Sequence, residues 1–283
     1  MENKFFETQA MHVSDITMQV TDLQRSIAFY QDFLGFQVME RTAHKAMFSA
    51  DGKKALITLE QPENVVAKQR RTTGLYHVAI LLPSRIDLAN FLKHLLQAGR
   101  AYTLQLGAAD HLVSEALYFS DPDGNGIEVA SDRLSSTWNW SGEFVQMSTD
   151  PLDADGLLES VTADWNKMPE KTLIGHIHLH VNNLREAKEF YIEGLGFQEV
   201  MAFSGASFLS DRGYHHHVAI NTWNGTDAPI PDSNETGLHV FTIAYPTKEE
   251  TEKAKQRLEA LGYSVNEDMV KDPAGNQIVL SFN

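Results

Sequence analysis

The stretch ITMQVTDLQRSIAFYQDFLGF, at residues 16–36, recurs later in the chain as IHLHVNNLREAKEFYIEGLGF, at residues 177–197. In the first copy Ile16, Met18 and Val20 alternate with polar residues, which is the pattern of a half-buried strand. Apolar residues then recur at helical spacing until Gly35, a residue typical of helix ends. Because this repeat is too long to be accidental, the chain consists of two related halves.

Each half contains a second unit built on the same plan. The second pair is YHVAILLPSRIDLANFLKHLLQAG at residues 76–99 and LHVFTIAYPTKEETEKAKQRLEALG at residues 238–262. The endings SDPDGNGIEVA and KDPAGNQIVLS also correspond. Short strand-like runs separated by Gly and Asp turns follow each helix. The sequence therefore predicts an α+β protein of four βαβββ modules.

The four modules predict a division of the chain into three parts. Modules one and two occupy residues 1–137, a connector without the module pattern occupies residues 138–172, and modules three and four occupy residues 173–283. We expect Trp138 and Trp140 of the connector to pack against a domain.

Composition excludes several classes of function. The chain has 283 residues, and 23 Lys and Arg against 38 Asp and Glu give a net charge of −15, which repels nucleic acid and anionic lipid surfaces. It contains no cysteine, so any metal must be bound by His, Asp or Glu. The start of the chain has no signal-peptide pattern and no apolar run could span a membrane, so we expect a cytoplasmic protein. Whether copies assemble into a homo-oligomer stays open.

The HV strand, the helix ending FYxxxLGF and the DPxGNxI turn together resemble the vicinal oxygen chelate superfamily, over almost the whole chain. This superfamily includes glyoxalase I, bleomycin-resistance proteins and extradiol dioxygenases. The resemblance implies that modules pair into two cupped mixed β-sheet domains with flanking helices. It also implies that metal ligands come from the first and last strands of the modules. The length of four modules is similar to that of the two-domain catechol 2,3-dioxygenases.

The resemblance places one possible ligand on the first strand of every module, at Asp15, His77, His176 and His239. On the last strand the matching residue is Glu128 in module two but Val279 in module four. Valine has no lone pair for a metal, so a complete site in the second half is doubtful. His77 and Glu128 of module two need one more histidine, and module three offers His176. We therefore predict that modules two and three pair, and that His77, Glu128 and His176 bind the metal.

The resemblance also suggests the residues around the metal. Tyr118 stands ten positions before Glu128, as a tyrosine does in extradiol enzymes, and would hydrogen-bond the substrate oxygen. His216, in YHHHVAIN, matches an acid–base histidine, which could instead stabilise superoxide. Strand alternation puts His178 on the same face as His176, lining the substrate pocket, and turns His215 and His217 away from His216.

Other histidines receive weaker interpretations. His239 and Asp15 could form a degenerate second site, which we regard as nonfunctional. His12, His44, His94 and His111 are interpreted as packed or surface residues, because a single histidine on a strand is more often that than a ligand.

The leading hypothesis is an Fe(II)-dependent extradiol dioxygenase that acts on catechol or a small substituted catechol with dioxygen; Mn(II) could replace the iron. One alternative is a glyoxalase-like isomerase or lyase, which would use the same fold without oxygen. Such a site usually has a fourth protein ligand, and none is obvious in module three. The other alternative is a metal-free protein that binds small molecules, like the resistance proteins.

Overall fold

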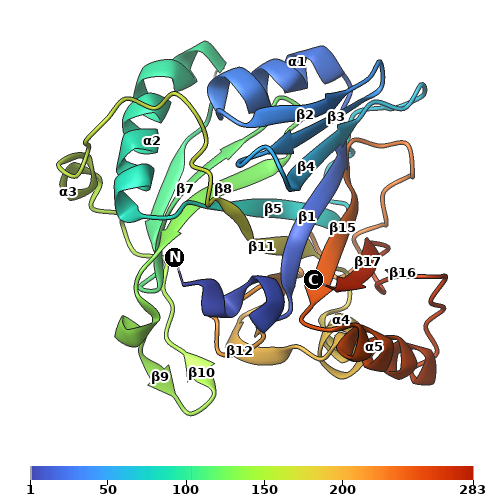
Figure 1. Cartoon of the computed structure of the whole chain (residues 1–283). Helices are drawn as coiled ribbons and strands as arrows, with labels where there is room; N and C mark the ends of the chain where they lie inside the picture. The colour runs from blue at the N-terminus through green and yellow to red at the C-terminus, as the bar shows by residue number, and fades with distance from the viewer. Residues whose placement is uncertain (1, 103, 283) are drawn as a thin grey trace.

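The computed structural model describes residues 2–102 and 104–282, and two large sheets dominate it (Figure 1). The first sheet has seven strands in the order β16-β17-β15-β1-β4-β3-β2. The second has eight strands in the order β12-β13-β14-β11-β5-β8-β7-β6, and β9 and β10 form a separate two-stranded hairpin. Mixed sheets and few helices confirm the predicted α+β fold of cupped sheets.

The elements have the following bounds. The strands of the first sheet are β1 His12–Gln19, β2 Gln37–Arg41, β3 Lys45–Ser49, β4 Ala55–Glu60, β15 Gly237–Tyr245, β16 Met269–Lys271 and β17 Gln277–Phe282. Those of the second are β5 Gly74–Leu81, β6 Gly107–Asp110, β7 Ser114–Ser120, β8 Gly126–Asp132, β11 Leu173–His180, β12 Gln198–Phe203, β13 Ala206–Ser210 and β14 Val218–Asn221. The hairpin is β9 Trp140–Ser141 and β10 Phe144–Val145, and the α-helices are α1 Leu23–Ile27, α2 Arg85–Ala98, α3 Ala154–Leu158, α4 Leu184–Lys188 and α5 Lys248–Ala260.

Each large sheet combines one module from each half of the chain. Modules one and four meet where β1 pairs antiparallel with β15, and modules two and three meet where β5 pairs antiparallel with β11. The predicted pairing of modules two and three is therefore confirmed. Each sheet contains strands from residues 1–137 and strands from residues 173–283. The predicted boundaries therefore do not separate one sheet from the other, and they stay a prediction about the modules of the sequence.

The helices and turns, in contrast, keep each half together. α1 and α2 lie together in the upper part of Figure 1, and α4 and α5 lie together at its lower right. The repeated FY of the first copy supplies Tyr30, whose buried hydroxyl donates to Asp121 of the DPDGN turn at 3.1 Å. Tyr191 donates to Asp272 of the DPAGN turn in the same way, at 2.9 Å. These bonds explain why both motifs occur in each half.

The repeated helix ends as its sequence predicts. The FYxxxLGF segments are π-helical turns at Ala28–Phe33 and Glu189–Leu195, which continue α1 and α4. Gly35 has a φ of +88°, and a Cβ there would lie 2.8 Å from the backbone nitrogen of Met168. Only glycine meets both requirements, so the connector can cross directly over this helix end.

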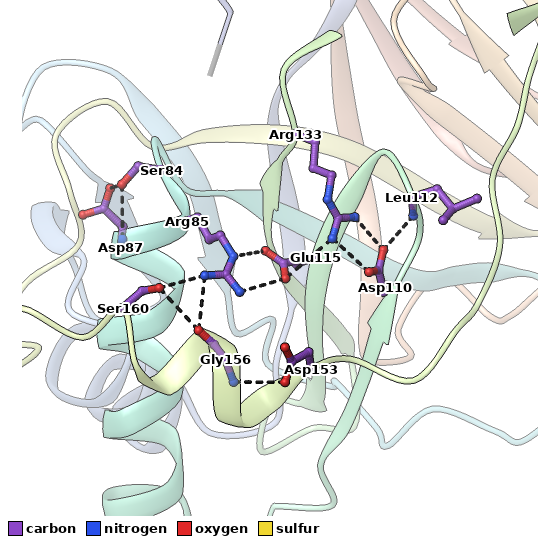
Figure 2. Close-up of polar contacts among 10 residues, drawn as sticks. All are labelled: Ser84, Arg85, Asp87, Asp110, Leu112, Glu115, Arg133, Asp153, Gly156 and Ser160. Carbon is purple, nitrogen blue, oxygen red and sulfur yellow. Dashed lines mark hydrogen bonds and ion pairs between the residues drawn. The ribbon is translucent and has the colours of Figure 1, made fainter. Parts of the chain in front are cut away.

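An ionic network around the buried carboxylate of Glu115 attaches the connector to the second sheet (Figure 2). Arg85, at the start of α2, donates to Glu115 of β7 at 2.6 Å and to Ser160 of the connector at 2.7 Å. Arg133 lies 3.7 Å from the same Glu115 carboxylate and donates to Asp110 of β6 at 2.5 Å. Trp138 is also buried in the fold, whereas Trp140 is exposed. The network fixes both the connector and the β6–β7 hairpin.

The core consists mainly of apolar faces between helices and sheets, with Phe29, Phe33, Phe91 and Phe119 in contact in the first half. Within the described residues, no helix is long and apolar enough to cross a membrane.

Candidate metal centre

Three side chains from three neighbouring strands converge on one point of the second sheet. Nε2 of His77 lies 3.2 Å from Nε2 of His176, and Oε2 of Glu128 lies 3.1 Å and 3.2 Å from these two nitrogens. All three residues are buried. The distances agree with the convergence that the sequence predicts for this set.

The register of the sheet explains why they meet. Ala79 of β5 is the partner of Glu128 on β8 and of His176 on β11. His77 lies two residues before Ala79, on the same face of β5, because side chains alternate along a strand. The small side chain of Ala79 therefore leaves space between Glu128 and His176, and the side chain of His77 lies beside that space.

The electrostatics favour forms of these groups that can bind a metal. Burial acts to raise the pKa of Glu128, but His176 and His77 outweigh it and hold that pKa well below its usual value. Burial lowers the pKa of His77. An ionised carboxylate and a neutral imidazole are the forms that coordinate a metal.

A cavity of about 570 Å³, which we call the metal-site cavity, opens beside these three residues. Tyr118, His178 and His216, all predicted site residues, line it together with the three candidate ligands. Its other walls are mainly aromatic and apolar, and include Tyr76, Met147, Met201, Phe203, Phe208 and Trp223. Its size and apolar walls suit a small organic molecule.

A chain of hydrogen bonds leads from His216 to a buried carboxylate. Nδ1 of His216 lies 2.8 Å from Nδ1 of His215, and Nε2 of His215 lies 3.0 Å from Asp132. Tyr214 donates to the other oxygen of Asp132 at 2.9 Å. The ring of His216 packs on that of His176, with centroids 4.0 Å apart.

These contacts determine where the protons lie on the two rings. A carboxylate only accepts, so Nε2 of His215 carries a proton and, in the neutral ring, Nδ1 accepts. Nδ1 of His216 must then donate, and its Nε2 keeps a lone pair. Burial, together with His176 and His215, lowers the pKa of His216 well below its usual value, so the ring is neutral at rest. His216 is therefore a proton acceptor at Nε2.

His178 is fixed by Asn221 of β14. Oδ1 of Asn221 accepts from the backbone of Trp223, so its Nδ2 donates to Nε2 of His178, at 2.9 Å. The proton of neutral His178 is therefore on Nδ1. His217, in contrast, bonds the backbone oxygen of Phe5 at 2.8 Å and packs among aromatic rings away from the cavity.

His111 also lies at the candidate site, although the sequence interpretation gave it no role. It lines the metal-site cavity, and its Nε2 lies 2.6 Å from the hydroxyl of Tyr118. Nδ1 lies 2.6 Å from the backbone oxygen of Ser148, so that nitrogen carries the proton and Nε2 accepts from Tyr118. The interpretation of His111 as a packed or surface residue did not foresee this contact with Tyr118 at the cavity. His111 lies in the turn between β6 and β7, so the sequence offered no signal for its contact with Tyr118 beyond their separation of seven residues.

Tyr118 remains protonated in this environment. Burial and the nearby Glu128 raise its pKa well above the usual value. Its hydroxyl proton points to His111, so a lone pair of the oxygen remains for another donor.

The residues of the suggested second site do not come together. The carboxylate of Asp15 accepts from Ser14 and Thr242, while His239 contacts Gln19 instead. Among residues 2–102 and 104–282, the only group of His, Asp and Glu with spacing for a metal is His77, Glu128 and His176.

Comparisons with known proteins agree with this geometry. A family model, Glyoxalase/Bleomycin resistance protein/Dioxygenase superfamily, matches residues 12–129 and 173–281. The chain is 44% identical to a catechol-2,3-dioxygenase of Bacillus subtilis (strain 168) over 279 residues, which are 95% of this chain and 96% of the relative. It is 25% identical over 131 residues, 46% of this chain and 67% of the relative, to biphenyl-2,3-diol 1,2-dioxygenase 3 of Rhodococcus globerulus.

A crystal structure from Bacillus subtilis, provisionally named a dioxygenase, has the same fold. Its TM-score is 0.64 at 14% identity, and the match covers 96% of this chain and 85% of that chain.

Proposed function

Because the chain belongs to the glyoxalase/bleomycin resistance protein/dioxygenase superfamily, we propose that it is an Fe(II)-dependent extradiol dioxygenase, which cleaves the ring of catechol or a small substituted catechol. The observation that carries this proposal is the convergence of His77, Glu128 and His176 beside an apolar cavity. The dioxygenase names of both sequence relatives support it.

The donor set fits a divalent metal ion. Ligand atoms about 2.1 Å from one ion and at right angles to one another lie about 3 Å apart. The three mutual distances of 3.1 to 3.2 Å are close to that value. Two imidazoles and one carboxylate suit Fe(II), and Mn(II) accepts the same ligands.

A bound ferrous ion would supply the redox chemistry with dioxygen and, in its open positions, would hold the two catechol oxygens. The aromatic walls at Phe208 and Trp223 suit the flat face of the ring.

His216 acts as the base for the bound catechol. Its Nε2 takes the proton of a substrate hydroxyl, because Nδ1 already donates to His215. The positive charge that develops on His216 is stabilised through His215 by the carboxylate of Asp132. The same ring can later return the proton to the product.

Tyr118 and His178 orient the substrate. The oxygen of Tyr118 accepts a hydrogen bond from the second substrate hydroxyl while its own proton stays with His111. Nδ1–H of His178 is available to donate to an oxygen atom in the cavity. The two residues place donor and acceptor groups around a ring whose remaining contacts are apolar.

The test is direct. The protein is loaded anaerobically with ferrous iron and mixed with catechol in air, and the yellow ring-fission product and oxygen uptake are recorded together. One molecule of oxygen consumed per ring cleaved is the expected result. No product and no uptake with catechol and several substituted catechols would refute the proposal.

A matched pair of variants separates the site from the fold. His77→Gln should lose both iron and activity. His239→Gln, at the equivalent strand position of module four, should keep both. Zinc- or nickel-dependent activity that ignores oxygen would indicate the glyoxalase-like alternative, and ligand binding that survives metal removal and His77→Ala would indicate the metal-free binding protein.

A further inference from the structure

A second and larger cavity adjoins the metal-site cavity. This outer cavity has a volume of about 840 Å³, and four residues line both cavities: Tyr76, His77, Gly107 and Tyr118. A molecule beside His77 and Tyr118 can therefore extend from one cavity toward the other.

The outer cavity is lined by three cations, Lys68, Arg70 and Arg71. Among residues 2–102 and 104–282, none of the three has a carboxylate within ion-pair distance. In a chain with a net charge of −15, three unpaired cations at one cavity are unusual. The one acid in the lining, Asp123, is already paired with Arg25 at 2.9 Å.

Lys68 is the best placed of the three. It is partly buried, and its ammonium donates to the backbone oxygen of Leu75 at 3.1 Å. Leu75 lies two residues before His77 on β5, which is about 7 Å along the strand, so Lys68 bonds a carbonyl close to this candidate ligand. Burial lowers the pKa of Lys68, and the nearby Glu235 opposes that effect without forming an ion pair. A partly buried ammonium that donates to one carbonyl has further N–H groups with which to bind an anion.

The side chain of Lys68 is not needed to anchor its segment. The backbone nitrogen of Lys68 donates to Thr236, and that of Gln69 donates to Glu235, both at 3.0 Å. The segment is therefore attached through its backbone to the residues that immediately precede β15. These backbone contacts explain the position of the loop, but they do not involve the charged groups of Lys68, Arg70 and Arg71.

Resting on the ring-cleaving function proposed above, we propose that Lys68, Arg70 and Arg71 receive a carboxylate on the substrate, so that the enzyme prefers catechols with a short acidic side chain. The catechol oxygens would lie at the metal and the ring in the metal-site cavity. The acidic side chain would pass Tyr76 and Tyr118, which line both cavities, and place its carboxylate in the outer cavity. Positive charge in a cleft raises both the capture and the affinity of an anionic ligand.

The experiment compares three substrates of the iron-loaded enzyme: catechol, 3,4-dihydroxyphenylacetate and the methyl ester of that acid. The ester has nearly the same shape without the charge. We expect kcat/KM for the acid to exceed that for the ester by about tenfold at low salt, and the ratio to shrink as salt rises. Anaerobic equilibrium binding of the acid and the ester gives a second readout that does not require turnover.

Two variants test the charges. Lys68→Met and the double variant Arg70→Gln with Arg71→Gln should each reduce the acid-to-ester ratio and leave kcat/KM for catechol unchanged. Lys53→Met, which removes an exposed cation outside both cavities, should change nothing. The double variant affects exposed side chains, so it tests the charges even if Lys68→Met folds poorly.

The outcomes distinguish the two proposals. If no catechol is cleaved, the proposed function fails, whereas anaerobic binding still measures the preference for the acid. If catechols are cleaved but the wild type treats acid and ester alike, the carboxylate proposal fails alone. Equal losses for all three substrates in the charge variants would also overturn it, because the cations would then act on a feature that all three share.

Discussion

Replacement of Asp132 by asparagine tests how His216 obtains its role as a base. The change keeps the shape of the side chain but puts an NH₂ group in place of one carboxylate oxygen. One of the two contacts of Asp132, with His215 at 3.0 Å or with Tyr214 at 2.9 Å, must then change. If the amide donates to Nε2 of His215, that ring carries its proton on Nδ1 and donates to His216 instead. Nε2 of His216 would then be protonated and could not take a proton from the substrate.

The size of the effect follows from the bond that is lost. A hydrogen bond to a charged group is worth about 1.5–3 kcal/mol, and about 1.36 kcal/mol corresponds to a factor of ten in rate. Asp132→Asn should therefore reduce kcat by about 10- to 150-fold. Because Asp132 is not one of the candidate ligands, the content of bound iron should not change.

The assay is steady-state oxygen uptake with catechol, with iron measured on the same samples. Tyr214→Phe is the matched control, because it removes the other partner of Asp132 and leaves His215 in contact with the carboxylate. Its loss of kcat should be smaller than that of Asp132→Asn, and the pH profile of kcat should move only in Asp132→Asn. Unchanged kcat in Asp132→Asn, or equal losses in both variants, would refute the role of this chain of bonds.

Three further predictions concern the fold around the site. Gly126→Ala should destabilise the protein by about 2–4 kcal/mol in denaturant unfolding, because its Cβ would overlap the backbone oxygen of Tyr76; wild-type stability would contradict this. Glu115→Gln should cost about 1–3 kcal/mol and increase proteolysis of the connector, because Arg85 loses its charged partner; an uncleaved connector of normal stability would argue against the network. Burial lowers the pKa of His217 in the folded protein to about 3. As the pH falls, this histidine therefore binds a proton in the unfolded protein before it does so in the folded protein. The contribution of His217 to the free energy of unfolding is complete above pH 6.5 and declines as the pH falls toward 3, with a loss of about 2 kcal/mol at pH 5. In His217→Gln the free energy of unfolding should depend less on pH in this range.

The sequence by itself determined the module plan and the candidate ligands. The repeat at residues 16–36 and 177–197 and the two DPxGN turns define four units, because strand and helix periodicity are local properties. Val279 also carries information on its own, since valine cannot bind a metal whatever the fold around it. At the ligand position that the resemblance assigns, this residue made a complete site in the second half doubtful and directed the prediction to His77, Glu128 and His176. The topology agrees, with β5 paired to β11.

Only the tertiary structure decided what surrounds those ligands. His111 contacts Tyr118 because a hairpin and the carbonyl of Ser148 fix its ring, and periodicity does not encode such a contact. Asp132 and His215 are far apart in the chain and meet at 3.0 Å through the pairing of modules two and three. Lys68, Arg70 and Arg71 lie in the loop before β5, and only the packing of that loop places them at a cavity shared with His77 and Tyr118. The physical reason is that side-chain contacts between distant segments depend on register and packing, whereas local patterns determine only the elements that carry those side chains.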